Sequence, residues 1–405
     1  KGENIYTYKY HRLFDCYTYN YAEKKRLVFE KSGQNPRKSR GIVGIPRVLN
    51  MYEEFPFWYT LFTEAGFDVK LSSESDFHRY EQALGSVMSD NICFPAKLVH
   101  SHIQELDDML ASVADDVQKF IFMPYVVFEP MDDSRNTNSY NCPIVSAYSD
   151  VIRSAMKLKN DVISPVINFR DEKLLQKQIC NFLKGYGVNK KEANMAFAEA
   201  QDAQHSYITD IQQKAEQILA QSRRDGMLTI LLAGRPYHTD PLIQHKLSEM
   251  IAALGVNVIS DDIVRGNLSV GAGDTCLVRQ WAYMNRLIKA GQWCAEQPFD
   301  VHYVQMTSFG CGPDSFIQDE IRIIMKKHNK PYTLLKIDDG SNIGSLKLRV
   351  RSLIESLSEQ KQGEGEHKKQ SEKSVKATGE QQKGAYKLPP VKRHILAPYF
   401  TEYLT

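Results

Sequence analysis

Short apolar runs and helical patterns alternate along the first part of the chain. A run rich in Ile and Val at residues 41–45 ends at Pro46, and a helical pattern over 51–65 follows it. Gly66 ends that pattern, and a second strand pattern begins at Phe67. The alternation continues through helices and strands over 95–110, 119–124, 145–156 and 161–167. Strand–helix–strand units at this spacing predict a parallel sheet that helices cover on both faces.

The second half of the chain repeats this alternation after a purely helical stretch. Residues 171–224 are helical and polar on one side, with Asn189 and Glu192 spaced as a capping box. One stripe at helical spacing holds Phe197, Ile208, Ile211, Ala215 and Ile218. Such a stripe is typical of packing between domains rather than of a cofactor site. Strand patterns then follow near 228–233, 256–260, 300–306 and 332–337, separated by helical patterns over 241–254, 277–296, 314–327 and 343–358.

These patterns predict an α/β protein with two doubly wound, Rossmann-like or flavodoxin-like parallel-sheet domains and a long helical bridge. Residues 358–385 are dominated by Lys, Glu, Gln, Gly and Ser, a composition that buries too little apolar surface to order itself. The expected parts are an extended lead-in (1–40), a first α/β domain (41–170), a helical bridge (171–226), a second α/β domain (227–357), a disordered linker (358–385) and the stub of a following region (386–405).

Charge and hydropathy exclude two kinds of partner. The formal net charge is +2, so no global field draws the chain onto nucleic acid or an acidic membrane. No apolar run approaches the roughly 20 residues that a membrane span needs. We therefore expect neither a nucleic-acid partner nor a membrane partner.

The seven cysteines indicate a reducing compartment. Their number is odd, no CxxC pair occurs, and the chain is far longer than disulfide-stapled secreted scaffolds. The first residues also lack a signal-peptide core, so we expect a cytoplasmic protein. The chain starts at Lys1 rather than Met, which indicates a piece of a larger protein, with tag removal as the alternative.

Three cysteines lie where parallel sheets usually place ligands. Cys93 precedes the helix at 95–110, Cys142 lies in the loop before the helix at 145–156, and Cys311 lies between a strand and a helix. Helix N-termini stabilise thiolates through unpaired N–H groups and a partial positive charge, which favours metal binding. The alternative for each is a small buried hydrophobic side chain. That alternative, or surface packing, is expected for Cys180, Cys276 and Cys294, whereas Cys16 lies in the irregular lead-in with no partner in sight.

Four basic side chains are candidate ligand-binding residues. Arg235 and His238 follow a strand and could hold a phosphate by charge-assisted hydrogen bonds, and Arg47 is a similar case after the first strand. Lys97, one turn beyond Cys93, could offset the negative charge of a bound cluster. The alternatives are that Arg235 pairs with a carboxylate, that His238 caps backbone, and that Lys97 is solvated.

Five segments resemble the 2-hydroxyacyl-CoA dehydratase activase-related family. They are Gly-Ile-Pro-Arg-Val-Leu-Asn-Met-Tyr-Glu-Glu-Phe-Pro-Phe-Trp (44–58), Cys-Phe-Pro-Ala-Lys-Leu-Val-His (93–100), Tyr-Asn-Cys-Pro-Ile-Val (140–145), Ala-Gly-Arg-Pro-Tyr-His-Thr-Asp (233–240) and Ser-Phe-Gly-Cys-Gly-Pro-Asp (308–314). The likeness extends over residues 41–357. In that family, large proteins join ATPase activase domains to a module like this one and to a dehydratase-subunit-like region.

The resemblance implies an iron–sulfur cluster, [4Fe–4S] or related, held by Cys93, Cys142 and Cys311 in a cleft between the domains and lost in air. It implies ATP-dependent activase domains and a dehydratase-like region as partners, with a CoA thioester as substrate of a 2-hydroxyacyl-CoA dehydratase (lyase) system. The module would relay low-potential electrons or act on the thioester. The chain lacks a GxxxxGK[ST] loop, so we expect no ATPase activity from it.

Two other hypotheses remain open. In one, the chain is a scaffold that docks activase domains onto a dehydratase, and its cysteines are structural. In the other, the three cysteines hold zinc, for which three thiolates and one open position are acceptable chemistry.

Overall fold

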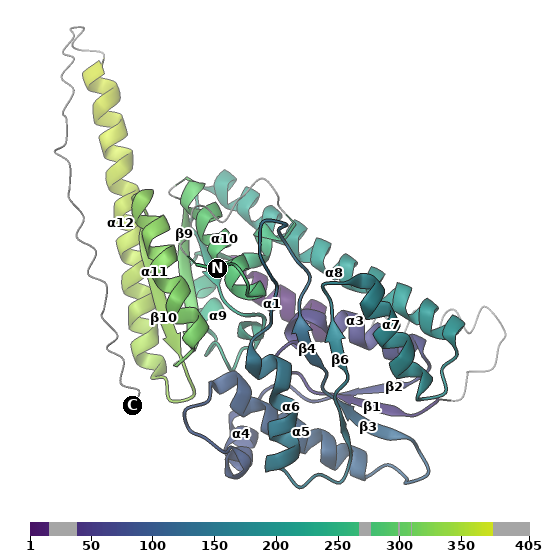
Figure 1. Cartoon of the computed structure of the whole chain (residues 1–405). Helices are drawn as coiled ribbons and strands as arrows, with labels where there is room; N and C mark the ends of the chain where they lie inside the picture. Colours follow the sequence, from purple (N-terminus) through teal and green to yellow (C-terminus); the bar gives the residue numbers. More distant parts are fainter. Residues whose placement is uncertain (16–38, 267–276, 299, 309, 376–405) are drawn as a thin grey trace, which may run out of the picture. The chain divides into compact units, whose positions relative to one another are not determined.

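The computed structural model describes residues 1–15, 39–266, 277–298, 300–308 and 310–375, with the backbone alone for 360–375. The chain divides into two compact units, Lys1–Ser358 and Glu359–Thr405. All the sheets described below belong to the first unit (Figure 1).

The first sheet is parallel, with strand order β2-β1-β3-β5. Its strands are β1 (Ile42–Ile45), β2 (Asp68–Leu71), β3 (Lys119–Phe122) and β5 (Val162–Ile163). The helices along this part of the chain are α3 (Met51–Glu64), α4 (Phe77–Ala83), η2 (Leu84–Ser86), α5 (Phe94–Ala111) and α6 (Pro143–Ala155). Every residue of α3 from Met51 to Thr63 is buried, including the two glutamates Glu53 and Glu54.

The second sheet is also parallel, with strand order β10-β9-β7-β8. Its strands are β7 (Thr229–Ala233), β8 (Asn257–Ile259), β9 (Val301–Ser308) and β10 (Tyr332–Ile337). Its helices are η3 (Pro236–Thr239), α9 (Leu247–Ala253), η4 (Asp261–Val264), α10 (Ala282–Glu296) and α11 (Gly312–Lys327). Strands β7, β8 and β9 are buried along their whole lengths, which is typical of parallel strands covered on both faces. These sheets confirm the predicted α/β fold class.

A small parallel pair, β4 (Tyr125–Phe128) and β6 (Val166–Asn168), continues beyond the first sheet. Two helices follow it, α7 (Glu172–Lys184) and α8 (Lys190–Asp225). Helix α8 contacts α3 on one side and β8 and η4 on the other, so it links the elements of both sheets (Figure 1). At 36 residues it is about 54 Å long. The predicted stripe is buried at Phe197, Ile211, Ala215 and Ile218, and Ile208 packs against the core at its edge.

The first residues of the chain differ from the extended lead-in that we expected. They form α1 (Ile5–Tyr10) and a π-helical turn, η1 (His11–Asp15). The hydroxyl of Tyr6 donates to the carbonyl oxygen of Leu232 over 2.5 Å, and Phe14 is fully buried. The signal is the aromatic spacing Tyr6, Tyr10, Phe14, which places three rings on one helical face.

Two predicted helices begin later than expected. The helix expected from 241 begins at Leu247, because His245 and Lys246 have positive φ angles of 50° and 55° that interrupt it. The helix expected from 277 begins at Ala282. Helix α12 (Ile343–Val375) extends past residue 358, where we expected a disordered linker. Lys, Glu and Gln, which dominate this stretch, are good helix formers.

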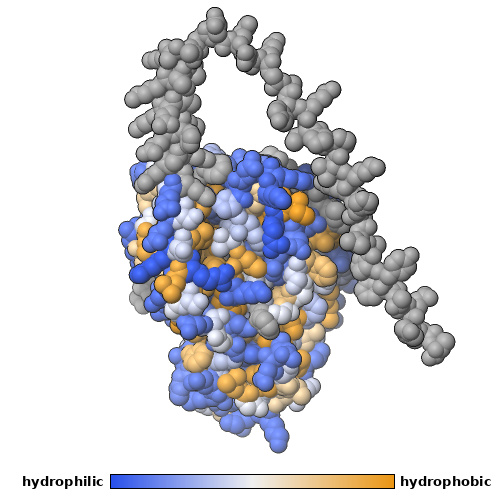
Figure 2. Space-filling model, turned by 90° about the vertical axis from the view of Figure 1, so that its left-hand side faces the viewer, coloured by the Kyte–Doolittle hydropathy of each residue, from blue (hydrophilic) through white to orange (hydrophobic). Residues whose placement is uncertain are grey.

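The surface of this protein mixes residue types. On the face drawn in Figure 2, hydrophobic residues are interspersed among hydrophilic ones. Among the described helices, none is both long and apolar enough to cross a membrane.

Candidate functional site

Three helices begin at the cysteines that the sequence singled out. Cys93 is the N-cap of α5, Cys142 of α6 and Cys311 of α11. Each is followed by a proline in the first helical turn, where the missing N–H costs nothing and the fixed φ suits the helix. All three side chains are half-buried. None of the three caps its helix through a side-chain hydrogen bond of the usual Ser or Asp kind.

The electrostatics of the three thiols show that they share one neighbourhood. Burial raises the pKa of Cys93 to about 12, and charge repulsion from Cys142 and Cys311 adds to this shift. Burial raises the pKa of Cys311 to about 11, with further contributions from Asp314 and Cys142. These charge effects connect thiols that are 49 and 169 residues apart in sequence (142 − 93 and 311 − 142).

Two backbone N–H groups of the first helical turns act on these thiols. The N–H groups of Ala96 and Asp314 lower the pKa of Cys93 and of Cys311, respectively, against the larger effect of burial. N–H donors of this kind stabilise thiolates and tune the sulfur ligands of metal centres. Three cysteines near helix N-termini are therefore residues of the type that binds a metal centre through thiolates. Among the described residues, however, no three His, Cys, Asp or Glu side chains already form a metal-binding group.

A buried ion pair joins the loops after β7 and β9 beside Cys311. The Arg235 guanidinium donates to Asp314 Oδ1 from Nη2 (2.5 Å) and from Nε (3.1 Å). The Thr307 hydroxyl donates to Asp314 Oδ2 over 2.9 Å. Burial alone would raise the pKa of Asp314, but the Arg235 charge holds it below its ordinary value. Strands β7 and β9 are neighbours at the point where the strand order reverses, the usual ligand position in such sheets.

His238 caps the backbone of the same loop. Its Nδ1 accepts the N–H of Arg235 over 2.9 Å, and burial lowers its pKa to about 4, so the imidazole is neutral near pH 7. Among the described residues its buried Nε2 has no hydrogen-bond partner. A Cβ at Gly234 would lie 2.6 Å from His238 Nδ1, so only glycine fits under this ring. Arg235 and His238 thus make the internal contacts that we had weighed as alternatives to ligand binding; their ligand-binding role stays a prediction.

Tyr237 lies against the cysteine neighbourhood. Its hydroxyl is buried, which raises its pKa well above the ordinary value, and the charges of Cys93, Cys142 and Cys311 each raise it further against the opposing charge of Arg235. Tyr237 is therefore a neutral phenol on which the charges of all three thiols act. The sequence contained Tyr237 within the 233–240 motif, but nothing in its spacing indicated this position.

Lys97 and Arg47 already have partners. The Lys97 ammonium forms an ion pair with Asp339 Oδ2 at 2.8 Å, and the Tyr80 hydroxyl donates to the same oxygen over 2.6 Å. Arg47 donates to the Tyr10 hydroxyl over 3.1 Å and lies 5.0 Å from the centre of the Phe14 ring. A ligand role for either side chain would compete with these contacts.

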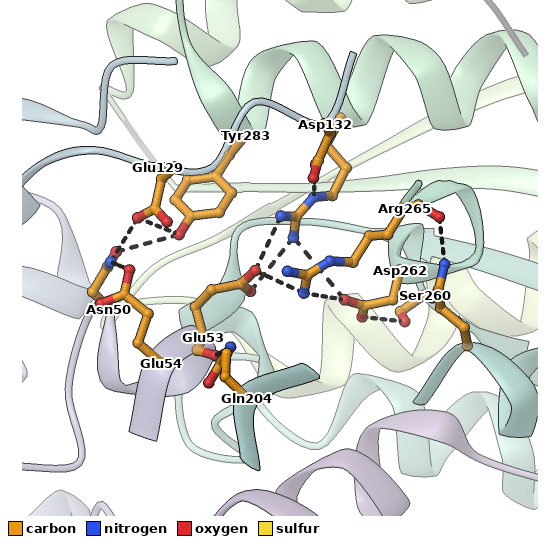
Figure 3. Close-up of polar contacts among 12 residues, drawn as sticks. Asn50, Glu53, Glu54, Glu129, Asp132, Gln204, Ser260, Asp262, Arg265 and Tyr283 are labelled. Carbon is orange, nitrogen blue, oxygen red and sulfur yellow. Dashed lines mark hydrogen bonds and ion pairs between the residues drawn. The ribbon is translucent and has the colours of Figure 1, made fainter. Parts of the chain in front are cut away.

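A buried cluster of ion pairs was missed by the sequence reading. Glu53 of α3 meets Arg265 Nη1 at 2.7 Å and Arg286 Nη2 at 3.0 Å, and Lys9 meets Asp262 at 2.7 Å. Figure 3 shows Glu53 and Asp262 pointing at Arg265 from different elements. The signal was the pair of adjacent glutamates inside an otherwise apolar helix. These charges compensate one another, so the cluster joins elements of both sheets without leaving a buried charge unpaired.

Beside this cluster lies a buried carboxyl pair, Glu54 and Glu129 (Figure 3). Asn50 Nδ2 donates to Glu54 Oε1 (2.7 Å) and to Glu129 Oε1 (2.6 Å), and the Tyr283 hydroxyl donates to Glu129 over 2.9 Å. Burial, then repulsion from Glu129, raises the pKa of Glu54 well above its ordinary value. Burial also raises the pKa of Glu129. Two carboxyls in such a site cannot both ionise, so the pair holds a proton near neutral pH.

This pair is connected to the cysteine site through one side chain. Asn141 Nδ2 donates to Glu129 Oε1 over 2.5 Å, while Asn141 Oδ1 accepts the N–H of Cys142 over 2.9 Å. Asn141 therefore fixes the start of α6 relative to the core of the first sheet.

Comparison with known families gives one match that covers more than half of the chain. A family model described as "CoA enzyme activase uncharacterised domain (DUF2229)" matches residues 42–264. The matched region contains Cys93, Cys142 and the loop after β7, and it ends before Cys311. No curated protein matches the sequence significantly.

Solved structures resemble the chain only remotely. One is the C-terminal domain of glucosamine-fructose-6-phosphate aminotransferase from Francisella tularensis, with 12% identity, coverage of 77% of this chain and 82% of that chain, and a TM-score of 0.20. Another is a candidate sugar binding protein from Salmonella typhimurium LT2, with 10% identity, coverage of 80% and 88%, and a TM-score of 0.18. At such TM-scores neither likeness informs the function.

Proposed function

Because the chain belongs to the family of the CoA enzyme activase uncharacterised domain, we propose that it is a redox module of a CoA-thioester dehydratase system. In this proposal Cys93, Cys142 and Cys311 bind an iron–sulfur cluster. The observation that supports it is that all three cysteines are helix N-caps, of α5, α6 and α11, and that the charges of Cys142 and Cys311 act on Cys93. When bound, such a cluster supplies one-electron transfer at low potential.

In this proposal, metal binding at the thiols is linked to the release of their protons. Without metal, burial keeps Cys93 and Cys311 protonated at neutral pH, since their pKa values are raised to about 12 and 11. A bound metal ion reverses this balance, because coordination deprotonates a thiol outright. The N–H groups of Ala96 and Asp314 then stabilise the thiolates. The sulfurs would have to turn toward a common centre on binding, since no metal-binding group is preformed among the described residues.

The surrounding residues hold the candidate site in place. The Arg235–Asp314 ion pair fixes the loop of Cys311 against the loop after β7. Tyr237 and His238 line this loop as neutral, buried groups, so they add no charge that opposes a cluster.

The proposal assigns the energy source to a partner. In systems that resemble this chain, ATP-dependent activase domains deliver the electron and a dehydratase-like region completes the reaction. The chain contains no GxxxxGK[ST] loop, so we propose that it receives electrons rather than hydrolysing ATP.

The direct test is anaerobic reconstitution with iron and sulfide. The wild-type protein should become brown and retain stoichiometric iron and sulfide after gel filtration. The triple variant Cys93→Ala/Cys142→Ala/Cys311→Ala should stay colourless, whereas Cys180→Ala, which removes a half-buried thiol outside the site, should behave as wild type.

Three other outcomes would contradict the proposal that these cysteines bind an iron–sulfur cluster. A triple variant that binds as much iron as wild type excludes these ligands. Colourless wild type with stoichiometric zinc after purification without added metal supports the zinc hypothesis. Colourless wild type without any metal supports a scaffold.

A further inference from the structure

A basic hollow lies between α7 and the beginning of α8, in a part of the chain that the cysteine site does not use. Its volume is about 590 Å³, within the range of small-molecule sites. Along α7 the lining residues recur every three or four positions, so one whole face of that helix forms a wall. The first turn of α8 closes the other side.

The lining carries four positive charges and no negative one. Lys173, Lys177 and Lys184 come from α7, Lys190 comes from α8, and no Asp or Glu lines the hollow. Within the described part of the chain none of these four ammonium groups has an ion pair or a hydrogen bond. On the same helix, Lys214 pairs with Glu3 at 3.1 Å and Arg223 with Asp300 at 3.3 Å. A solvated helix face normally mixes both signs, so this concentration of unpaired lysines requires another explanation.

The floor of the hollow is polar and already ordered. Gln176 Nε2 donates to Asn194 Oδ1 over 3.1 Å, and the Cys180 thiol donates to the same oxygen over 3.2 Å. Helix α8 begins at Lys190, so the positive end of a 36-residue helix adds to the field of the lysines. These features favour an anion that receives hydrogen bonds from several directions.

We propose that this hollow binds a small molecule that carries at least two phosphate groups. Lysines are flexible point charges that surround a diphosphate readily, and four of them exceed what a single carboxylate or monophosphate needs. Lys173 also lines a neighbouring hollow of about 660 Å³, whose other lining residues are Phe128, Asn168, Arg170, Asp171 and Glu172; its two carboxylates favour the organic part of a ligand there over a further phosphate. An organic group attached to the phosphates would find an aromatic side chain there. The inference does not depend on the cysteine site.

The test is calorimetric titration of the protein, without added metal, with pyrophosphate, ATP, coenzyme A, inorganic phosphate and adenosine. The first three should bind, with affinity that falls as salt rises, whereas inorganic phosphate should bind more weakly and adenosine not at all. If pyrophosphate binds with the same affinity as the nucleotides, the phosphate groups alone are sufficient for binding. If the nucleotides bind more tightly, the neighbouring hollow holds their organic part.

Two matched double variants test whether pyrophosphate binds in this hollow. Lys173→Gln/Lys177→Gln should weaken pyrophosphate binding about tenfold. Lys326→Gln/Lys327→Gln removes two exposed lysines from the last turn of α11 and should change the affinity less than twofold. Bound pyrophosphate should also slow alkylation of Cys180, measured by peptide mass spectrometry. Equal losses in the two variants, no slowing at Cys180, or adenosine binding as tight as that of ATP would each overturn the proposal.

Discussion

At the residue scale, the most informative groups are buried polar ones that a sequence pattern does not mark. The pair Glu54–Glu129 holds a proton in the folded protein, because burial and mutual repulsion raise the pKa of Glu54. The unfolded chain loses that proton above the ordinary Glu value of about 4.3. The stabilising effect is therefore complete below this pH and is lost as the pH rises toward the folded pKa.

Replacement of Glu54 by Gln keeps a neutral hydrogen-bonding group and removes the titration. Relative to Glu54→Gln, the wild-type free energy of unfolding should fall as the pH rises above the ordinary Glu value of about 4.3, by up to about 1.4 kcal/mol per pH unit. Urea unfolding at each pH measures this, with Glu216→Gln on the exposed face of α8 as control. A difference between wild type and Glu54→Gln that stays constant with pH contradicts a shared proton.

The ion pair of Arg235 and Asp314 supports the candidate site, and removing one partner should be costly. Asp314→Ala leaves the Arg235 guanidinium buried without a counter-charge and should destabilise the fold by about 3–5 kcal/mol. The double variant Arg235→Met/Asp314→Leu should lose much less, because no charge is then stranded. Urea unfolding compares them. Equal losses in both variants would show that packing rather than charge explains the effect.

At the element scale, backbone geometry at helix ends makes a separate prediction. Helix α8 ends at Gly226, whose φ of 64° lies in the left-handed region, and a Cβ there would touch nothing within 4 Å. Gly226→Ala should therefore cost about 1 kcal/mol from the backbone conformation alone. Gly85 also has free space around a Cβ but no positive φ, so Gly85→Ala should be neutral or slightly stabilising. Thermal unfolding of both variants measures the difference.

The sequence predicted most elements because each carries a local signal. Strand β7 is an unbroken apolar run, and the capping box of Asn189 and Glu192 marks the start of α8. The late start of α9 was missed, because His and Lys are not residue types that predict a positive φ, as His245 and Lys246 have here. The burial of the first fifteen residues was missed as well, since it depends on packing against β8 and α8 rather than on local propensity.

The cysteine site could be predicted only in part for the same reason. The position of Cys311 before a helix follows from local pattern, but its closeness to Cys93 depends on how the two sheets meet. The buried contacts of Glu53 with Arg265 and Arg286 also join distant segments, and without homologous sequences no pattern links them. Long-range partners are the part of a site that residue types alone do not determine.

At the scale of the whole molecule, the two sheets should unfold together. Residues Lys1–Ser358 form one compact unit, and α8 packs on elements of both sheets. Trp58 lies in α3 beside the first sheet and Trp293 in α10 beside the second. One variant should retain only Trp58 and another only Trp293, with Trp281 replaced in both. Their urea transitions, measured by fluorescence, should coincide. Separate midpoints would show two independent domains, as the sequence alone led us to expect.

The central claim is that the fold brings Cys93, Cys142 and Cys311 together to hold one iron–sulfur cluster. Electron paramagnetic resonance of the anaerobically reconstituted, dithionite-reduced protein tests it most directly. The account predicts a cluster signal in the wild type that is lost or altered when any one of the three cysteines is replaced by alanine, and unchanged in Cys180→Ala. A wild type without a cluster signal, or a signal that survives the loss of all three thiols, contradicts the account.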